Sequence, residues 1–559
     1  MRFKSRDFSN NKVVLDVRDL SVRLPNQPQV APILNQVSLQ IRARETACLV
    51  GESGSGKSVT SLAVMGLLPK DALRVTGGGI TLSGRNLLEL TQKEMRAARA
   101  RNMAMIFQEP MTALNPVMRV GDQIEEVLKV HGDLPQKARQ ERVLAIMEQV
   151  HLPDVRRVYA SYPHQLSGGQ RQRIMIAMAL ILEPELLIAD EPTTALDVTT
   201  QGQILKLIAE LQEKQDTAVL FITHDMGVVA EIADSVHVMK DGQVVEQAPV
   251  EQLLRQPRED YTRKLLKAVP SLIPRQERPE TQSEPETQGE KVLQVQKLRK
   301  VYGGRGFFRR GEGTLAAEDV SFAITRGRTL GIVGESGSGK STVARCVMRL
   351  IEPTDGQIVV AGSEIAQLSR QALRPHRRHI QIVFQDPFRS LNPRWKVGRS
   401  LVEGPVNYGA SRQEAMKQAG DLMELVGLPR EALGRYPHQF SGGQRQRIAI
   451  ARAVAMKPDV LVADEAVSAL DVSIQAQVLE LLADIQEKLG VAILFITHDL
   501  RVAAQICDDI LVMQNGKIVE YGPAGDVLAN PRHSYTRALT DAAPGRGWDF
   551  ANFRELQSA

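Results

Sequence analysis

The sequence predicts an α/β protein made of two tandem, homologous domains, each built on a mainly parallel core sheet. The first observation behind this prediction is a duplication: a long pattern of residues recurs in the second half of the 559-residue chain. The second is that short apolar runs rich in β-branched residues alternate with segments of helical period, which is typical of parallel strands and covering helices. The third is a glycine-rich motif, present twice, that follows such an apolar run and opens a helix.

The duplication sets the domain boundaries. GESGSGKS at 51–58 recurs at 334–341, and SGGQRQR at 167–173 recurs at 441–447. Three further pairs follow the same order: Gln108 with Gln385, Asp190-Glu191 with Asp464-Glu465, and His224 with His498. Two units of about 270 residues are large enough to fold independently. We expect domains at 12–269 and 291–545, joined by a flexible linker over 270–290, which is rich in Pro, Glu, Gln, Thr and Ser.

Within each half, the elements follow from periodicity. Residues 219–224 and 493–498 predict buried strands, and 201–214 predicts a helix. The stretch from about Leu88 to Ser161, with a charged amphipathic segment at 136–148, predicts a helical insertion between strands of the sheet.

Composition excludes several classes of protein. The formal net charge is only +5 with no basic block, so charge does not suggest nucleic-acid binding. No run of about 18 uncharged apolar residues exists, and the polar N-terminus lacks a signal-peptide core, so we expect no membrane span and a cytoplasmic location. The three cysteines are too far apart for a metal or disulfide framework and are expected to be buried apolar residues.

The two glycine-rich motifs fit GxxxxGK[ST], the phosphate-binding loop. Glycines let the backbone fold around phosphates, so that N–H groups and the helix N-terminus face the anion. Lys57 and Lys340 are expected on the β- and γ-phosphates, and Ser58 and Ser341 on Mg²⁺.

Each half also has a buried strand that ends in two carboxylates, Asp190-Glu191 and Asp464-Glu465. Ligands of open α/β sheets collect at the carboxyl ends of strands. The first acid suits the water shell of Mg²⁺, and the second can orient the attacking water or accept its proton.

Together these motifs resemble the nucleotide-binding domains of ATP-binding-cassette (ABC) transporters. Ser167–Gln170 and Ser441–Gln444 match the signature loop of that family, Gln108 and Gln385 its Q-loop, 195–197 and 469–471 its D-loop, and His224 and His498 its switch histidine. The resemblance implies P-loop NTPase domains, each with a parallel core sheet, a β subdomain and a helical insertion. It also implies that each signature loop faces the phosphate loop of the opposite half.

The resemblance assigns the site residues in three groups. Glu191, His224, Glu465 and His498 would be catalytic. ATP would be bound by Gly51, Glu52, Ser53, Gly54, Ser55, Gly56, Lys57, Ser58, Val59, Gln108, Ser167, Gly168, Gly169, Gln170, Tyr302, Gly334, Glu335, Ser336, Gly337, Ser338, Gly339, Lys340, Ser341, Thr342, Gln385, Ser441, Gly442, Gly443 and Gln444. Mg²⁺ would be bound by Ser58, Gln108, Asp190, Ser341, Gln385 and Asp464.

Smaller features resemble the dipeptide, oligopeptide and nickel importers: YPHQ before each signature loop, LNP after each Q-loop, and Tyr-Thr at 261–262 and 535–536. The fused two-domain form is most similar to the ATPases of glutathione importers. This implies an ATP-hydrolysing subunit on the cytoplasmic face of the bacterial inner membrane. Its partners would be two transmembrane permease subunits and, indirectly, a periplasmic solute-binding protein, with no direct contact to the transported solute.

Two departures from the family pattern concern the sites. Leu24 aligns with Tyr302, where the family uses an aromatic residue to stack on adenine, so the first half is expected to hold the base less well. Ala466 stands where the first half has Pro192 after the glutamate, which loosens the backbone beside Glu465 without removing its carboxylate.

A different class, the tandem-cassette ATPases that act on ribosomes, is the main alternative. Those proteins carry a long charged helical linker, whereas 270–290 is short and proline-rich. DNA-repair cassette ATPases have coiled-coil or zinc insertions that this sequence lacks. The solute stays open among peptides, glutathione, opine-like compounds and nickel chelates.

Overall fold

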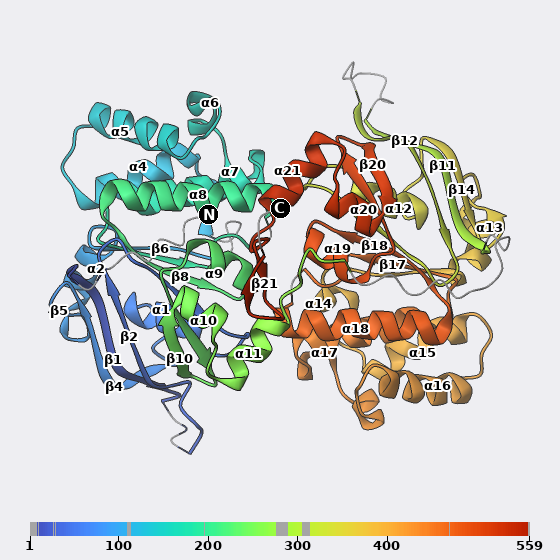
Figure 1. Cartoon of the computed structure of the whole chain (residues 1–559), viewed down its shortest axis with the longest axis horizontal. Helices are drawn as coiled ribbons and strands as arrows, with labels where there is room; N and C mark the ends of the chain where they lie inside the picture. The colour runs from blue at the N-terminus through green and yellow to red at the C-terminus, as the bar shows by residue number, and fades with distance from the viewer. Residues whose placement is uncertain are drawn as a thin grey trace. The chain divides into compact units, whose positions relative to one another are not determined.

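The computed structural model describes residues 8, 10–25, 27, 29–108, 113–194, 196–274, 289–303, 313–468 and 470–556. The chain divides into two compact units (Figure 1). The first comprises Met1–Leu196, Thr200–Val269 and Pro544–Ala559, and the second comprises Asp197–Thr199 and Pro270–Ala543. Of the linker expected at 270–290, residues 275–288 lie outside the described residues.

The first unit contains a six-stranded sheet in the order β10-β9-β3-β8-β7-β6, in which only the β10–β9 pair is antiparallel. Its strands are β3 (Thr46–Val50), β6 (Met103–Ile106), β7 (Leu186–Asp190), β8 (Ala218–Thr223), β9 (Ser235–Lys240) and β10 (Gln243–Pro249). An antiparallel sheet, ordered β2-β1-β4-β5, is formed by β1 (Val13–Arg23), β2 (Leu34–Arg42), β4 (Arg74–Leu82) and β5 (Arg85–Asn86).

The helices of the first unit cover its six-stranded sheet and extend beyond it. They are α1 (Lys57–Val64), α2 (Gln92–Ala98), α4 (Val120–His131), α5 (Gln136–Gln149), α6 (Val155–Tyr159), α7 (Gly168–Leu180), α8 (Val198–Gln215), α9 (Met226–Ile232), α10 (Val250–Arg255) and α11 (Asp260–Lys267). In Figure 1, α4, α5 and α6 gather at the end of this unit away from the β1–β2–β4 sheet.

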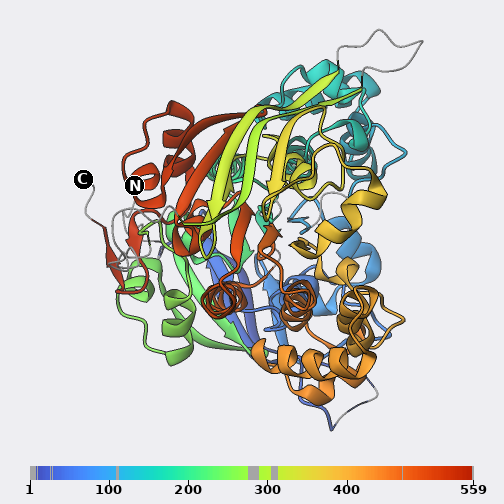
Figure 2. The ribbon, with the colours of Figure 1, turned by 90° about the vertical axis from the view of Figure 1, so that its right-hand side faces the viewer.

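The second unit repeats this architecture. Its antiparallel sheet, ordered β12-β11-β14-β15, contains β11 (Lys291–Tyr302), β12 (Thr314–Thr325), β14 (Asp355–Val360) and β15 (Ser363–Glu364). Its six-stranded sheet, ordered β16-β17-β18-β13-β19-β20, contains β13 (Thr329–Val333), β16 (Ile380–Val383), β17 (Val460–Asp464), β18 (Ala492–Thr497), β19 (Asp509–Gln514) and β20 (Lys517–Pro523). In Figure 2 the yellow-green strands β11 and β12 run side by side.

The helices of the second unit occupy matching places along the chain. They are α12 (Lys340–Val347), α13 (Arg370–Leu373), α14 (Pro387–Ser390), α15 (Val397–Asn407), α16 (Arg412–Leu425), α17 (Gly442–Val454), α18 (Val472–Leu489), α19 (Leu500–Ile506), α20 (Ala524–Ala529) and α21 (Ser534–Ala542). No helix in the described part of either unit is long and apolar enough to cross a membrane.

The predicted fold class is confirmed, and so are the strands expected near 219–224 and 493–498. These strands are apolar throughout because parallel strands are buried on both faces. The prediction for 88–161 was wrong in one respect. Residues 103–106 form β6, which pairs in parallel with β7, so only the part that follows this strand is a helical insertion. All three cysteines are buried and unpaired, as predicted.

The last described residues of the chain pack into the first unit. They include β21 (Trp548–Asp549), which pairs with β22 (Arg554–Glu555). The Gly545 N–H donates to the Glu231 carboxylate on α9 at 3.1 Å, and the Arg255 guanidinium of α10 lies 5.3 Å from the centre of the Trp548 ring. Trp548 and Phe550 are both almost fully buried, so this segment contributes to the core of the first unit.

A histidine lies in the core of the first unit. His237 in β9 is fully buried, and neither of its ring nitrogens has a hydrogen-bond partner in the described structure. Burial disfavours the imidazolium and lowers the pKa of His237 to about 4. The position that corresponds to His237 in the second unit is Leu511 in β19, which is also fully buried.

We expect the stability of the first unit to be acid-sensitive because of His237. Its folded pKa of about 4 is below the unfolded value of 6.5, so the unfolded state binds more protons between these values. Neutral His237 therefore makes its full contribution to the free energy of unfolding above pH 6.5. This contribution is lost as the pH falls toward 4, by about 3 kcal/mol in total.

Calorimetric unfolding at pH 7 and pH 5 tests this expectation. The variant His237→Leu should lose less stability than the wild type on acidification, and the matched variant Leu511→His should give the second unit a new acid sensitivity. Equal losses in the wild type and in His237→Leu would contradict the assignment.

Candidate functional site

The phosphate loops lie between β3 and α1 in the first unit, and between β13 and α12 in the second. Gly51 has φ 149°, and a Cβ there would stand 2.3 Å from the carbonyl oxygen of Met239. Gly334 has φ 151° and would meet the oxygen of Met513 at the same distance. Glycine is required at both positions because the loop passes directly against the neighbouring strand.

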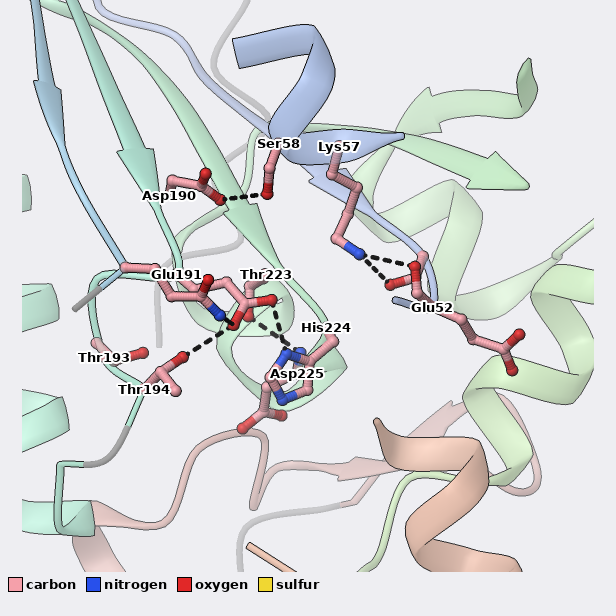
Figure 3. A network of polar contacts seen from close by, with 12 residues as sticks. Glu52, Lys57, Ser58, Asp190, Glu191, Thr193, Thr194, Thr223, His224 and Asp225 are labelled. Carbon is pink, nitrogen blue, oxygen red and sulfur yellow. Dashed lines mark hydrogen bonds and ion pairs between the residues drawn. The ribbon is translucent and has the colours of Figure 1, made fainter. Parts of the chain in front are cut away.

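The lysines of these loops are buried and bind the carbonyl groups of their own loop. Lys57 Nζ donates to Gly51 O at 2.7 Å. It also donates to Glu52 O at 2.9 Å, as Figure 3 shows. Lys340 Nζ donates to Gly334 O and Glu335 O, both at 2.7 Å. Burial lowers the pKa of Lys340, against the nearby charge of Glu465. Each loop therefore holds a lysine ammonium group in its centre through hydrogen bonds to its own backbone.

The hydroxyl at the start of each first helix faces the first carboxylate of the Asp-Glu pair. Ser58 Oγ donates to Asp190 Oδ1 at 3.4 Å, and Ser341 Oγ donates to Asp464 Oδ1 at 3.3 Å. Burial raises the pKa of Asp190 to about 6 and also raises that of Asp464. A hydroxyl and a carboxylate at this spacing are hard oxygen ligands of the kind that Mg²⁺ prefers, so the residues present fit this ion.

The second acid of each pair has an unusual backbone conformation. Glu191 has φ 47° and Glu465 has φ 49°, in the left-handed region that costs a residue with a side chain about 1–3 kcal/mol. Their N–H groups donate to Ile222 O at 2.9 Å and to Ile496 O at 3.0 Å, which holds each glutamate to the neighbouring strand. Strain of this kind is concentrated at functional sites.

In the first site the carboxylate of Glu191 is surrounded by donors. Gln108 Nε2 donates at 2.8 Å. Thr194 Oγ1 donates at 3.0 Å, and His224 Nδ1 lies 3.1 Å away (Figure 3). Burial opposes ionisation, but the hydrogen bond and charge of His224 and the hydroxyl of Thr194 outweigh it. They lower the pKa of Glu191 to about 2, so the carboxylate is ionised and accepts hydrogen bonds.

The second site repeats this arrangement with one change. Gln385 Nε2 donates to Glu465 Oε2 at 2.7 Å, and His498 Nδ1 lies 3.4 Å from Glu465 Oε1. The hydroxyl of Ser468, which corresponds to Thr194, donates instead to the backbone oxygen of Glu465 at 3.0 Å. The pKa of Glu465 is again lowered, by the hydrogen bond and charge of His498 against burial.

Each unit therefore brings the lysine, serine, aspartate, glutamate, glutamine and histidine expected from the sequence to one edge of its sheet. Both glutamines, expected on Mg²⁺, contact the glutamates here. Sequence reasoning missed Thr194. The signal for it was weak. Thr194 follows Glu191 by three residues, and only the hydroxyl residue at the matching position of the second half, Ser468, would have drawn attention to it.

The signature loops form the N-caps of α7 and α17. Ser167 Oγ accepts from Gln170 N at 3.3 Å while Gln170 Oε1 accepts from Ser167 N at 3.0 Å, and Ser441 and Gln444 make the same reciprocal pair. This capping box explains the spacing of serine and glutamine. The Ser hydroxyl proton stays available as a donor because the oxygen is the acceptor in the cap.

The two glycines of each signature loop have different surroundings. A Cβ on Gly169 would meet Thr200 at 2.7 Å, and one on Gly443 would meet Ile474 at 2.4 Å. A Cβ on Gly168 has no neighbour closer than 3.9 Å, and one on Gly442 has none within 4 Å. The second glycine is thus required by packing, whereas the first leaves open space beside the loop. Ala195 and Ala469 of the D-loops lie outside the described residues.

The residue expected on adenine, Tyr302, is the last residue of β11. Tyr302 is 41% exposed, and Lys300 Nζ lies 5.2 Å from the centre of its ring. Its sequence counterpart Leu24 directly follows β1. An exposed aromatic ring is available for stacking on a base, whereas Leu24 offers no aromatic face.

Comparisons with known proteins agree with this geometry. The family described as "ABC transporter" matches residues 34–194 and 317–468. The family described as "Oligopeptide/dipeptide transporter, C-terminal region" matches residues 245–305 and 519–552. Both families match twice, and the first match of the second family extends past the linker to residue 305.

Curated relatives match over nearly the whole chain. "Glutathione import ATP-binding protein GsiA" of Salmonella choleraesuis (strain SC-B67) is 47% identical, over 96% of this chain and 90% of the relative. The protein of the same name from Pectobacterium atrosepticum is 46% identical, over 95% of this chain and 90% of the relative. A solved structure, cbiO1 from Clostridium perfringens, is 29% identical, covers 43% of this chain and 92% of its own, and has a TM-score of 0.38.

The chain belongs to the ABC transporter family and is an ATPase with two fused ATP-binding cassettes. It resembles the GsiA proteins along most of its length and carries the C-terminal region of the oligopeptide and dipeptide transporters twice. It is therefore an ATP-binding subunit of an importer, associated with a membrane complex as a peripheral component. The ribosome-acting alternative is not supported.

The glutamates are tested by the double variant Glu191→Gln/Glu465→Gln. The amide keeps the shape of the side chain but cannot take a proton from water, so ATP turnover should fall by about 100-fold or more. ATP binding should be preserved. Phosphate release and equilibrium ATP binding measure the two effects, and turnover near the wild-type rate would falsify the assignment.

The difference between Leu24 and Tyr302 predicts unequal nucleotide affinity. Stacking of a base on an aromatic residue contributes about 1–3 kcal/mol, so Tyr302→Ala should weaken the second site by about 5- to 100-fold. Leu24→Tyr should tighten the first site. Photo-crosslinking of labelled ATP to each half measures both, and equal labelling that neither substitution changes would show that the two positions do not contact the base.

Proposed function

We propose that this chain is the energy-coupling ATPase of a bacterial ABC importer for peptides or peptide-like solutes, with glutathione as the first candidate. The observation that carries the proposal is the completeness of both sites. Each unit has a lysine held inside its phosphate loop, a serine that donates to the aspartate, and a glutamine and a histidine in contact with the glutamate. The names of the relatives and the two oligopeptide-transporter regions support import as the coupled process.

The residues of each site suit defined steps of ATP hydrolysis. Lys57 can exchange its loop carbonyls for the β- and γ-phosphates of ATP. Mg²⁺, held by Ser58, Asp190 and, after a change of partner, Gln108, would neutralise phosphate charge. The ionised Glu191 can accept a hydrogen bond from the attacking water and orient it, and His224 can donate to the γ-phosphate. Ser341, Gln385, Lys340, Asp464, Glu465 and His498 would have these roles in the second site.

The expected partners are two transmembrane permease subunits on the cytoplasmic face of the inner membrane, with a periplasmic binding protein acting through them. No contact with nucleic acid or with the transported solute is proposed. The domain boundaries at 12–269 and 291–545, with the linker at 270–290, are part of this proposal, because each domain would supply one half of each ATP site.

We further propose that the cassettes bind ATP head to tail. The Lys57 loop would share one ATP with Ser441, Gly442 and Gly443, and the Lys340 loop would share the other with Ser167, Gly168 and Gly169. The open space beside Gly168 and Gly442 supports this arrangement, because a phosphate could approach the backbone there.

The substitution Gly168→Asp tests the head-to-tail proposal. The side chain has room within its own unit, so the variant should fold, but its charge opposes the γ-phosphate of the ATP bound by Lys340. Trapped nucleotide should be lost from the Lys340 half, as shown by photo-crosslinking and proteolysis within 270–290. Gly442→Asp is the matched control and should empty the Lys57 half. Loss of nucleotide from the half that carries the substitution would contradict the proposal.

The coupled solute is tested with the chain assembled with its permease subunits in nanodiscs. ATP turnover should rise when binding protein loaded with glutathione is added, and the Glu191→Gln/Glu465→Gln complex should show no rise. Stimulation by a loaded dipeptide, oligopeptide or nickel chelate, but not by glutathione, would replace the candidate solute. Stimulation by ribosomes alone would contradict the importer function.

A further inference from the structure

Two tyrosines of the C-terminal regions reach the phosphate loops. Tyr261 and Tyr535 are each the second residue of a helix, α11 or α21, in the segments that match the oligopeptide-transporter C-terminal region. The hydroxyl oxygen of Tyr261 accepts from Glu52 N at 3.2 Å, and that of Tyr535 accepts from Glu335 N at 3.0 Å. The same contact thus forms twice, between residues about 200 positions apart in each unit.

The peptide unit that the tyrosine contacts is also the one that holds the lysine. In the peptide between Gly51 and Glu52, the N–H donates to Tyr261 and the carbonyl oxygen accepts from Lys57 Nζ at 2.7 Å. A trans peptide is planar, so its N–H and C=O point in opposite directions and one cannot rotate without the other. The tyrosine therefore fixes the direction of the carbonyl to which the ammonium binds.

Glycine at positions 51 and 334 gives the backbone beside this peptide more conformational freedom than a residue with a side chain would, and both glycines have φ values in the region that favours glycine. In the second unit the peptide between Gly334 and Glu335 has the same two partners, Tyr535 and Lys340. A hydrogen bond from outside the loop restrains a rotation that the glycine itself permits.

Each tyrosine is presented by a firmly anchored helix start. The buried carboxylate of Glu246 in β10 accepts from Arg258 N at 2.8 Å and from Glu259 N at 3.1 Å, immediately before α11. Glu520 in β20 accepts from Arg532 N and His533 N at the same distances, immediately before α21. Burial raises the pKa of Tyr535 to about 12, so its hydroxyl is neutral at physiological pH.

We propose that Tyr261 and Tyr535 are positioning residues for nucleotide binding. Their hydroxyls hold the second peptide of each phosphate loop so that the loop is preformed around its lysine before ATP arrives. The C-terminal region of each unit is thereby coupled directly to the occupancy of its phosphate loop. The proposal rests on the assignment of these loops as the ATP sites in the proposed function.

The experiment uses the full chain with Tyr261→Phe/Tyr535→Phe, which removes only the two hydroxyl groups. Loss of the hydrogen bond that each loop N–H donates to its tyrosine should weaken ATP binding and raise KM by about 3- to 10-fold. The value of kcat should change by less than about 2-fold, because the ring does not touch the reacting groups. The single variants should each weaken only the site in their own half.

A matched control removes the hydroxyl of a tyrosine in the same region that makes no hydrogen bond to a phosphate loop in the described part of the chain. Tyr521→Phe, in β20, changes a half-exposed ring and should leave KM unchanged. Amide hydrogen exchange without nucleotide gives a second readout. Peptides covering 51–58 and 334–341 should exchange faster in the double variant, whereas the thermal midpoint should stay within about 2 °C of the wild type.

The possible outcomes separate the inference from the proposed function. If the wild type does not bind ATP, the proposed function fails. If the wild type binds ATP and the double variant has an unchanged KM and unchanged exchange at both loops, the inference alone is overturned. A fall in kcat at constant KM would also overturn it, since the hydroxyls would then act in the reaction rather than in the positioning of the loop.

Discussion

The buried ammonium group of each phosphate-loop lysine is the charge around which its site is arranged. Lys57 and Lys340 are almost completely shielded from water, and a buried cation is tolerated only where oxygen atoms replace its hydration shell. Two loop carbonyls provide these oxygens, which explains why the backbone of the loop curls around its own side chain. Phosphate oxygens can replace the carbonyls without leaving the charge unpaired, so the loop is ready for an anion.

The two sites use the same parts but do not hold the glutamate in the same way. Thr194 adds a hydroxyl donor to the Glu191 carboxylate, whereas Ser468 turns to the backbone of Glu465. Glu191 therefore has one more fixed partner to release before it can bind a water molecule. The replacement of Pro192 by Ala466 lies in the same turn, so the differences between the halves are concentrated beside the glutamates.

The sequence was sufficient to predict the fold and the groups at the edge of each sheet. Four of these groups lie at or just after the carboxyl ends of neighbouring strands, so their closeness follows from topology alone: Lys57, Asp190, Glu191 and His224. The contacts between individual side chains were harder to predict from the sequence. The contact of Gln108 with Glu191 depends on rotamers, which the spacing of residues does not encode.

Other features required the three-dimensional structure. The strand β6 has only four residues, too few for periodicity to distinguish it from the helices around it. His237 is polar by type, so its residue type does not indicate that it is fully buried. The hydrogen bond between Tyr261 and the phosphate loop joins residues 209 positions apart, and a dipeptide motif gives no indication of so distant a partner.

The packing of residues 544–556 into the first unit has a consequence for synthesis. Chains emerge from the ribosome in order, so the first cassette begins to fold while Trp548 and Phe550 have not yet been translated. Its surface at α9 and α10 stays uncovered until the whole second cassette has been made. The first domain to start folding is then the last to be completed, and a chain truncated shortly before residue 544 leaves this surface exposed although every residue of both nucleotide sites is present.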